Sequence, residues 1–327
     1  MRGRRDLPLF RTSVLVDRNH HRCRWRRRQP LKKLRSNHRV RDIDHLVMVV
    51  NDLEAARVVY SQLGLTTTPR ALHPFGTENF LVQLQGNFLE VVGVADASII
   101  PPHGDGIFSF ARANADFLAR RVGMSSLVFQ SADARADRSD FLAAGLQAYE
   151  NVDFSRKAVL PDGAEVTVAF SLAFVTDPTM PEVTFFTCQQ HAPEHFWKPE
   201  YQVHANGAQQ VAEVIMVAPD PSSHADFFRG IHGDGALALS DDGLSVETGV
   251  GSISMVTPDI FETRFGIPTP GPTTTAHFAG FRIVVKNLRD THTYLATASV
   301  ETRVMTDAVQ VGPYGHFGIV IEFTENV

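Results

Sequence analysis

One order of elements recurs along this chain and constrains its fold more than any other feature of the sequence. The first copy begins with a short apolar strand at residues 43–50, followed by Asn51 and Asp52, residue types that begin helices. An amphipathic helix follows, with Leu53, Ala56, Tyr60 and Leu63 on one face and Gly64 at its end. Three further strands are predicted at residues 66–72, 79–85 and 88–94. This copy is therefore a βαβββ module.

The same order returns three more times, as a match of pattern rather than of residue identity. β-branched and aromatic runs separated by Gly and Pro argue against a helical solenoid. We therefore predict an α+β fold of tandem βαβββ modules. The later copies consist of a strand at 126–131, a helix at 133–146 and strands at 166–175 and 183–189; a strand at 212–218, a helix at 222–231 and a strand at 251–256; and a strand at 281–285, a helix at 288–298 and strands at 301–305, 308–311 and 317–323.

The length of the chain favours about two domains. Its 327 residues exceed what one hydrophobic core usually supports, so two cores are expected. The positions of the modules divide the chain into a basic extension at 1–41, a domain of two modules at 42–200 and a second, divergent domain of two modules at 201–327.

The basic extension differs in charge from the rest of the chain. Residues 1–41 carry fifteen Lys and Arg with two acidic residues, whereas the other 286 residues carry sixteen Lys and Arg with thirty-four acidic residues. A segment this basic can bind nucleic acid or an anionic surface through phosphate contacts. Because it is too polar to bury a core, we favour a disordered extension or a start codon assigned too far upstream. Nucleic-acid binding is the least favoured function.

Several features indicate a cytoplasmic protein without a membrane partner. No stretch approaches the roughly 18 consecutive apolar residues of a membrane span, and the basic extension lacks the apolar region of a secretory signal. The only cysteines are Cys23 and Cys188, which provide neither a disulfide framework nor a thiolate zinc site. We expect Cys188 to be a small buried hydrophobe rather than a reactive thiol.

Three stretches of the first module resemble the opening module of glyoxalase-like domains. They are the sequence DHLVMVVNDL at 44–53, the motif at 73–79 with His-Pro and Gly-Thr-Glu-Asn, and FLEVV at 88–92. These domains belong to the vicinal oxygen chelate superfamily, with glyoxalase I, extradiol dioxygenases and bleomycin-resistance proteins. The resemblance is close over 42–190 and looser over 209–325. It implies that paired modules form cupped, incomplete β-barrels, with metal ligands projecting into the cup from the first and last strands of a module.

His45 and Glu90 are the best candidate metal ligands. Each lies within an apolar strand, so each needs a partner or a ligand if it is buried. The resemblance implies that the first and last strands lie side by side, which brings the two residues together. An imidazole and a carboxylate suit a divalent ion such as Fe, Mn, Ni or Zn, with open positions for water and substrate oxygens. The alternative is a His–Glu hydrogen bond in a metal-free pocket.

A third metal ligand is harder to identify. Alignment of the modules puts Ser126 and Thr187 at the places of His45 and Glu90, and neither is a convincing ligand. His191 is a better ligand type and shares the strand face of Thr187 by the two-residue period. It lies four residues further on, roughly 13 Å along a strand, so it can bind the same ion only if the strand ends or bends.

Other polar residues are predicted to act on the substrate or to bind it. His73 precedes a Gly turn, and its unperturbed pKa of about 6.5 suits a general base; His73 and Glu90 are the predicted catalytic residues. Asn79 of the resembling motif is a predicted substrate contact. Residues 188–207 are rich in His and aromatic side chains and are typical of a loop that lines a pocket, although a domain-bridging loop is the alternative. Its predicted substrate contacts are His195, Trp197 and His204.

The third and fourth modules lack this pattern. The places of His45 and Glu90 hold Glu213 and Ser254 in one module and Gly280 and Glu322 in the other, with His277 and His316 close by in sequence. The resemblance to dioxygenases implies two His and one Glu in the second half, so dioxygenase activity is in doubt.

Two functions remain. The first is a divalent-metal-dependent enzyme whose ion holds two oxygens of a small substrate and stabilises an anion, which covers isomerase, lyase and dioxygenase chemistry. The second is a metal-free protein of the bleomycin-resistance type, which sequesters a small molecule in an apolar cup. Whether the modules pair within one chain or across a homodimer stays open.

Overall fold

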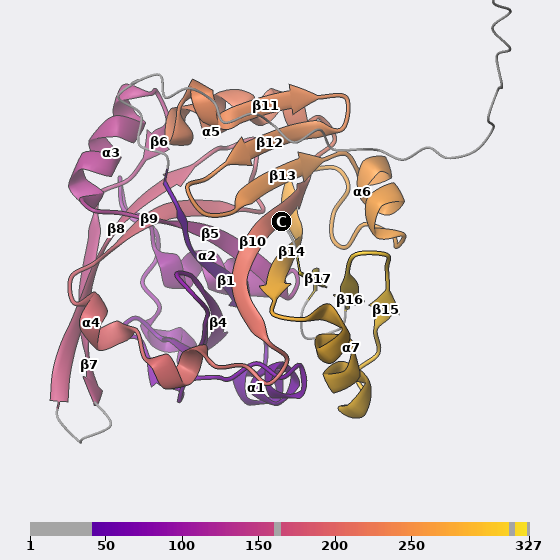
Figure 1. Ribbon diagram of the computed structural model, residues 1–327. Helices are drawn as coiled ribbons and strands as arrows, with labels where there is room; N and C mark the ends of the chain where they lie inside the picture. Colours follow the sequence, from indigo (N-terminus) through magenta and orange to yellow (C-terminus); the bar gives the residue numbers. More distant parts are fainter. Residues whose placement is uncertain (1–40, 160–164, 314–317, 326–327) are drawn as a thin grey trace, which may run out of the picture. The chain divides into compact units, whose positions relative to one another are not determined.

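The computed structural model describes residues 41–159, 165–313 and 318–325 (Figure 1). They belong to one compact unit, His38–Val327, which contains two open β-sheets. Within these ranges no helix is both long and apolar enough to span a membrane.

The first sheet contains two copies of the module. The first copy consists of β1 (Ile43–Val49), α1 (Leu53–Gln62), β2 (Ala71–Leu72), β3 (Thr77–Gln83) and β4 (Phe88–Val94). After α2 (Phe110–Leu118), the second copy consists of β5 (Gly123–Gln130), α3 (Ala134–Ala143), β6 (Gln147–Ala148), β7 (Val152–Val159), β8 (Glu165–Thr176) and β9 (Thr184–Gln190). Parallel pairing of β1 with β4 and of β5 with β9 puts the first and last strands of each copy side by side, and β1 and β5 join the copies as antiparallel neighbours.

The second sheet repeats this arrangement. Its strand order β11-β12-β13-β10-β14-β17-β16-β15 matches the order β2-β3-β4-β1-β5-β9-β8-β6 of the first sheet, where β7 also pairs with β8. The predicted α+β fold of cupped, incomplete barrels is therefore confirmed. The elements are β10 (Ala208–Val217), α5 (Ala225–His232), β11 (Leu237–Ser240), β12 (Gly243–Glu247), β13 (Ser252–Val256), α6 (Pro258–Phe265), β14 (His277–Val285), α7 (Leu288–Thr297), β15 (Arg303–Val304), β16 (Val309–Val311) and β17 (Val320–Thr324).

Side-chain caps begin the helices where the sequence predicts them. Asp52 accepts a hydrogen bond from the Ala55 amide at 2.9 Å, and Asp133 and Asn287 cap α3 and α7 in the same way. On α1 the buried residues are Leu53, Ala56 and Tyr60, the predicted apolar face.

Several elements differ from the prediction. The expected strand at 66–72 is reduced to the two residues of β2, and the apolar pattern did not predict β6, β7, β11, β12, α2 or α6. The most consequential of these is β7, which alternates polar and apolar residues and pairs along its whole length with β8.

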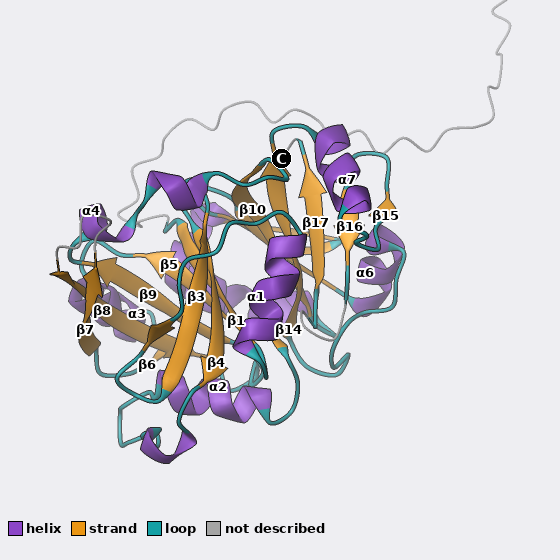
Figure 2. Cartoon of the chain, turned by 90° about the horizontal axis from the view of Figure 1, so that it is seen from below, coloured by secondary structure: helices purple, strands orange, loops and turns teal. Residues whose placement is uncertain are grey.

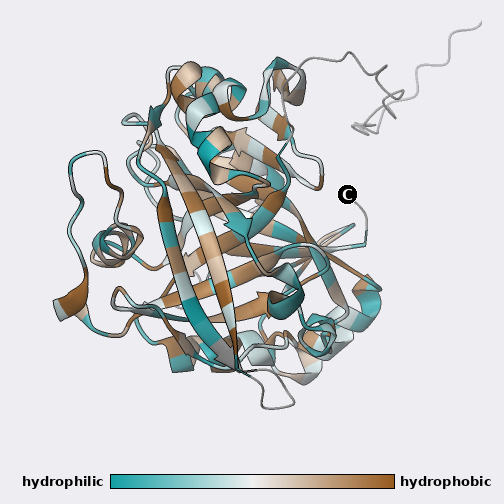
Figure 3. Ribbon diagram, turned by 90° about the vertical axis from the view of Figure 1, so that its left-hand side faces the viewer, coloured by the Kyte–Doolittle hydropathy of each residue, from teal (hydrophilic) through white to brown (hydrophobic). Residues whose placement is uncertain are grey.

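The two sheets share their largest hydrophobic core, instead of holding one separate core each as the length suggested. Phe185 of β9 contacts Phe228 of α5 and Phe278 of β14, with ring centroids 5.6 and 5.7 Å apart. Each sheet also has a smaller apolar cluster on its other face, which we call the inner face. Figures 2 and 3 show the helices around the sheets and the apolar residues along the strands.

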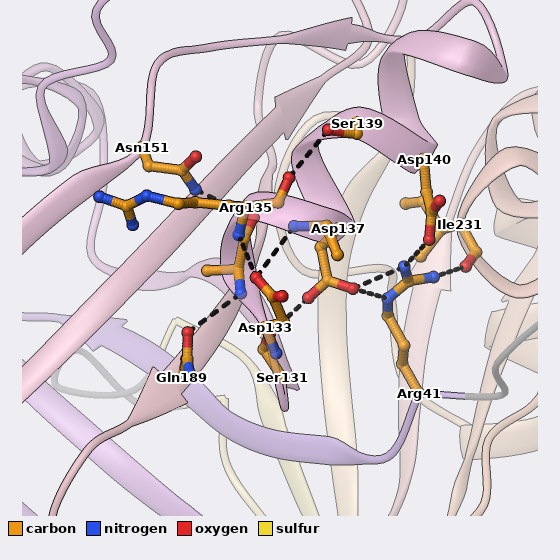
Figure 4. A network of polar contacts seen from close by, with 12 residues as sticks. Arg41, Ser131, Asp133, Arg135, Asp137, Ser139, Asp140, Asn151, Gln189 and Ile231 are labelled. Carbon is orange, nitrogen blue, oxygen red and sulfur yellow. Dashed lines mark hydrogen bonds and ion pairs between the residues drawn. The ribbon is translucent and has the colours of Figure 1, made fainter.

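Arg41, which the charge pattern groups with the basic extension, is buried in this unit. Its guanidinium donates two hydrogen bonds to one oxygen of Asp137 on α3, at 2.8 and 3.2 Å, and another to the Ile231 carbonyl on α5 (Figure 4). Ser131 donates to the other oxygen of Asp137. The folded body therefore begins no later than residue 41; the other predicted domain boundaries stay predictions.

Candidate functional site

The inner face of the first sheet holds a small apolar cavity with a polar cluster in its wall. Its free volume of about 50 Å³ equals the space of a few water molecules. Five polar or charged side chains line it: His45, His73, Asn79, Glu90 and Arg156. The apolar lining consists of Phe75, Leu81, Phe88, Phe110, Phe154, Phe170, Leu172, Phe186, Cys188 and Phe196.

His45 on β1 faces Glu90 on β4, as the parallel pairing of these strands predicts. His45 Nδ1 lies 2.6 Å from Asp44 Oδ1, and because a carboxylate only accepts hydrogen bonds, Nδ1 is the donor. In the neutral imidazole the lone pair is then on Nε2, which lies 3.6 Å from Glu90 Oε2. The His45 ring stacks on Phe88 with centroids 4.3 Å apart, which fixes its plane.

His73 approaches the other oxygen of Glu90. Asn79 on β3 donates from Nδ2 to Glu90 Oε1 at 2.6 Å, and the same nitrogen lies 3.3 Å from His73 Nε2. Because an amide NH₂ group only donates, Nε2 of His73 is the acceptor and Nδ1 donates to Thr77 Oγ1 at 2.8 Å. Both histidines therefore direct Nε2 toward the same carboxylate.

A tight turn brings His73 over this cluster. Gly76 has a φ of +89°, and a Cβ there would lie 2.5 Å from the Asp96 carbonyl oxygen, so only glycine fits without a shift. The turn lets the His73 amide donate to the Thr77 carbonyl at 2.9 Å as β3 begins. The Pro-Phe-Gly sequence thus sets the position of a candidate catalytic residue.

Burial lowers the pKa of His73. The Glu90 carboxylate opposes this shift, and the positive charge of Arg156 adds to it. His73 is therefore neutral at neutral pH and can accept a proton at Nε2.

Arg156 on β7 is a member of this site that the sequence did not reveal. Burial lowers its pKa, and the Glu90 carboxylate acts in the opposite direction. The signal that could have found it is the alternation Val152, Phe154, Arg156, which puts an arginine on the apolar face of a strand.

The donor atoms fit a divalent ion in their chemistry but supply only two ligands. His45 Nε2 and Glu90 Oε2 are 3.6 Å apart, and Asp44 orients the imidazole as carboxylates behind metal-bound histidines do. His73 Nε2 lies 3.6 Å from the other oxygen, Glu90 Oε1. Among the described residues no three His, Cys, Asp or Glu side chains are arranged around one metal position. Water or substrate oxygens would have to complete the coordination.

His191 does not join this cluster. Its Nε2 lies 2.8 Å from Ser171 Oγ on β8, next to Asp153. On β9 the cavity-lining residues are Phe186 and Cys188, so Thr187 between them points to the opposite face of the sheet, and the face predicted for His191 is the wrong one for the cavity. Ser126 also does not line the cavity.

The predicted loop residues contribute to the site only indirectly. His204 accepts from the Thr66 amide at Nδ1 and donates to the Gln83 carbonyl from Nε2. Both ring nitrogens are therefore used in hydrogen bonds to the backbone. Trp197 packs behind the cavity against Phe88 and Phe196, with centroids 5.8 and 5.2 Å apart. Neither it nor His195 lines the cavity, whereas Phe196 between them does.

The corresponding face of the second sheet contains ion pairs. Glu213 accepts from Arg264 at 2.7 and 2.8 Å and from Arg282 at 2.8 Å, and Arg282 also donates to Glu322. Burial opposes the ionisation of Glu213, but the two arginines hold its pKa below the ordinary value. Glu213 and Glu322, which occupy the places of His45 and Glu90 in the aligned modules, are therefore neutralised by two arginines. His277 is buried between the Thr275 and Pro270 carbonyls, and His316 is outside the described residues.

Comparisons with known proteins agree with this architecture. A family model described as a glyoxalase-like domain matches residues 43–230, more than half of the chain. No curated protein sequence matches significantly. Three solved structures share the fold: a hypothetical protein from Staphylococcus aureus (12% identity, TM-score 0.62, covering 87% of this chain and 99% of that one), a mutant of 4-hydroxymandelate synthase from Streptomyces coelicolor (13%, 0.53, 87% and 92%) and a Mn(II)-bound glyoxalase from Novosphingobium aromaticivorans (11%, 0.51, 88% and 82%).

The family match covers the first sheet and the start of the second, and the structural matches cover both. The chain therefore belongs to the glyoxalase-like domain family of the vicinal oxygen chelate superfamily.

Proposed function

We propose that this chain is a divalent-metal-dependent enzyme that acts on a small, oxygen-bearing substrate in the cavity of the first sheet. One observation carries the proposal: two histidines with their Nδ1 atoms tied to Asp44 and Thr77 both direct Nε2 at Glu90. Asn79 donates to Glu90 Oε1 and lies within reach of His73 Nε2, which leaves His45 Nε2 and Glu90 Oε2 facing each other at 3.6 Å. Two such acceptors repel unless a cation or a proton lies between them. The Mn(II) of the similar glyoxalase structure is in line with this proposal.

His45 and Glu90 are the proposed ligands of the ion. When bound, a divalent ion would supply Lewis-acid chemistry by polarising a substrate oxygen. Asp44 would keep His45 in the tautomer that can ligate, and Gln190, which donates to Asp44 at 3.2 Å, would hold that carboxylate in place.

His73 is the proposed general base. It is neutral because burial lowers its pKa, and its Nε2 can take a proton from a carbon or oxygen acid bound in the cavity. Asn79 positions both His73 and Glu90 through one amide nitrogen. The phenylalanine walls exclude water, which strengthens the electrostatic interactions of the cluster. These roles suit isomerase or lyase chemistry.

Metal uptake by the full chain tests the proposal. After chelator treatment and dialysis, the protein is titrated with Mn²⁺ and with Zn²⁺ by calorimetry. We expect one ion per chain, at least about a tenfold loss of affinity in His45→Ala and in Glu90→Gln, and unchanged binding in the control His195→Ala, whose side chain is outside the cavity. If the wild-type chain takes up neither ion, the metal-dependent enzyme is wrong.

The second candidate is a metal-free protein that sequesters a small apolar molecule. The observation in its favour is the wall of seven phenylalanines around a site with only two convenient metal ligands. Under this alternative, apolar ligands raise the melting temperature of the chelator-treated protein, and metal ions leave it unchanged.

A further inference from the structure

We propose that Arg156 is the anion-binding residue of the cavity and that the natural ligand carries a carboxylate on a small apolar or aromatic body. This inference rests on the proposed function only in that both use the same cavity. It adds the chemical class of the ligand, about which the metal-ligand cluster says nothing.

The strand β7 aims Arg156 into the cavity. Side chains alternate along a strand, so Phe154 and Arg156 share a face, and both line the cavity. Lys157, the next residue, is on the other face, where its Nζ lies 2.7 Å from Glu165 in solvent. The pairing of Arg156 with Val168 on β8 fixes the backbone from which the guanidinium extends.

Arg156 differs from the other basic residues of this region in lacking a partner. Arg135 pairs with Asp153 at 2.9 Å, Arg138 with Glu150 at 2.5 Å, and Lys157 with Glu165. Within the described part of the chain, by contrast, Arg156 makes neither a hydrogen bond nor an ion pair shorter than 4.0 Å. None of its guanidinium nitrogens is among the buried atoms without a hydrogen-bond partner, so the half-buried group keeps contact with water. A ligand anion that displaces this water would supply the missing partner.

The charges around the cavity favour a singly charged ligand group. Two charged side chains line the cavity: Glu90 contributes one negative charge, and Arg156 contributes one positive charge. A carboxylate matches the fork of the guanidinium with two parallel hydrogen bonds and one charge. A phosphate carries a charge of about −1.5 to −2, which would leave an excess negative charge near Glu90.

The apolar lining specifies the rest of the ligand. Phe75, Phe154 and Phe110 meet edge to face around His73, with centroid distances of 5.6 Å between Phe75 and Phe154 and 6.1 Å between Phe75 and Phe110. Such rings bind a flat or compact apolar body. Because the free volume is about 50 Å³, a body the size of a phenyl ring enters only when these side chains shift outward. A carboxylate held by Arg156 would therefore orient the body of the ligand between the rings, with its other end toward His45 and Glu90.

The test uses three probes that share a phenyl ring: benzoate, its neutral isostere benzamide, and phenyl phosphate. Calorimetric titrations are run on the chelator-treated full chain, so that a bound metal cannot capture the carboxylate. We expect benzoate to bind at least about tenfold more tightly than benzamide, since a charge-assisted pair adds that much. Arg156→Met should abolish this preference, Arg156→Lys should keep part of it, and the neighbouring control Lys157→Met should keep all of it.

Circular dichroism establishes that each variant is folded, and Arg156→Gln replaces Arg156→Met if the latter is not. Three results would overturn the inference. The first is equal affinity of the wild type for benzoate and benzamide, which includes no binding of either at millimolar concentration. The second is a preference for benzoate that survives in Arg156→Met, and the third is tighter binding of phenyl phosphate than of benzoate. Metal uptake is measured separately, so failure of the metal proposal leaves this result interpretable.

Discussion

At the scale of single residues, the hydrogen bonds at Nδ1 decide what the two site histidines can do at Nε2. Asp44 accepts from His45, and Thr77 accepts from His73, so both lone pairs are directed into the site. Asn79 donates a hydrogen bond to Glu90 Oε1, which leaves Oε2 to face His45. Residues that never touch the ligand therefore determine the tautomers on which the proposed chemistry depends.

The variant Asp44→Asn tests this control of the tautomer. The new amide can donate to His45 Nδ1, which moves the proton to Nε2 and removes the lone pair that would bind the ion. We expect a loss of Mn²⁺ affinity of about 10-fold to 100-fold by calorimetry. Asp96→Asn, on an exposed turn, is the control. Unchanged affinity in Asp44→Asn would contradict the assigned tautomer.

A different histidine, His232 on α5, governs stability rather than chemistry. It is almost fully buried, neither ring nitrogen has a hydrogen-bond partner among the described residues, and it packs edge to face on Phe129 at 4.6 Å. Burial, aided by the nearby charge of Arg41, lowers its pKa to about 3. Below a pH of about 6.5 the unfolded chain takes up a proton here that the folded chain does not.

Folding stability should therefore decrease as the pH falls from about 6.5 toward about 3, with His232 contributing up to about 1.4 kcal/mol per pH unit. The substitution His232→Leu removes this contribution. Urea unfolding of both proteins between about pH 7.5 and pH 5 measures it. The same pH dependence in the variant and the wild type would show that His232 is not the group responsible.

At the scale of elements, the helices α3 and α5 are joined through Arg41. Asp137 in the first turn of α3 accepts from the guanidinium, which also donates to the Ile231 carbonyl of α5. Both members of the ion pair are almost fully buried, whereas Asp140, 3.4 Å from the same guanidinium, is 67% exposed. The buried carboxylate should matter far more than the exposed one.

We expect Asp137→Ala to reduce the free energy of unfolding by about 3–5 kcal/mol, because it leaves a buried, uncompensated charge. The matched control Asp140→Ala should change it by less than about 1 kcal/mol. Urea denaturation of both variants gives the two values. Equal effects would contradict the larger role assigned to Asp137 in the network of Figure 4.

The same scale shows why β7 was missed and the opening strands were not. The strands β1 and β4 are buried on both faces, and their sequences are apolar except for Asp44, His45 and Glu90. The strand β7 mixes Asp153, Ser155 and Lys157 with its apolar residues and pairs with β8 alone. A partly solvated edge strand gives only a period-two pattern, and Arg156 interrupts it.

At the scale of the whole unit, the shared core predicts that the two sheets unfold together. Phe185, Phe228 and Phe278 join strands and a helix from both halves. The variant Phe228→Ala should cost about 3–5 kcal/mol and should speed amide exchange equally in β1 and in β14. Hydrogen exchange by mass spectrometry measures both. Faster exchange in one half alone would support the two independent domains predicted from the length.

The sequence by itself determined the module, its four repetitions and the starts of the capped helices, which follow from local periodicity. The meeting of His45 with Glu90 was expected from the resemblance to glyoxalase-like domains, which implied that the first and last strands of a module lie side by side, and the parallel pairing of β1 with β4 agrees with it. The tertiary structure decided the rest. The faces of Thr187 and His191 depend on a register that shifts by one residue without an obvious signal, and Arg156 reaches the cavity only because β7 folds back along β8 from more than sixty residues beyond Glu90. No local pattern encodes contacts between distant segments. In the folded chain these contacts surround His45 and Glu90 with a phenylalanine-lined cavity and add the positive charge of Arg156.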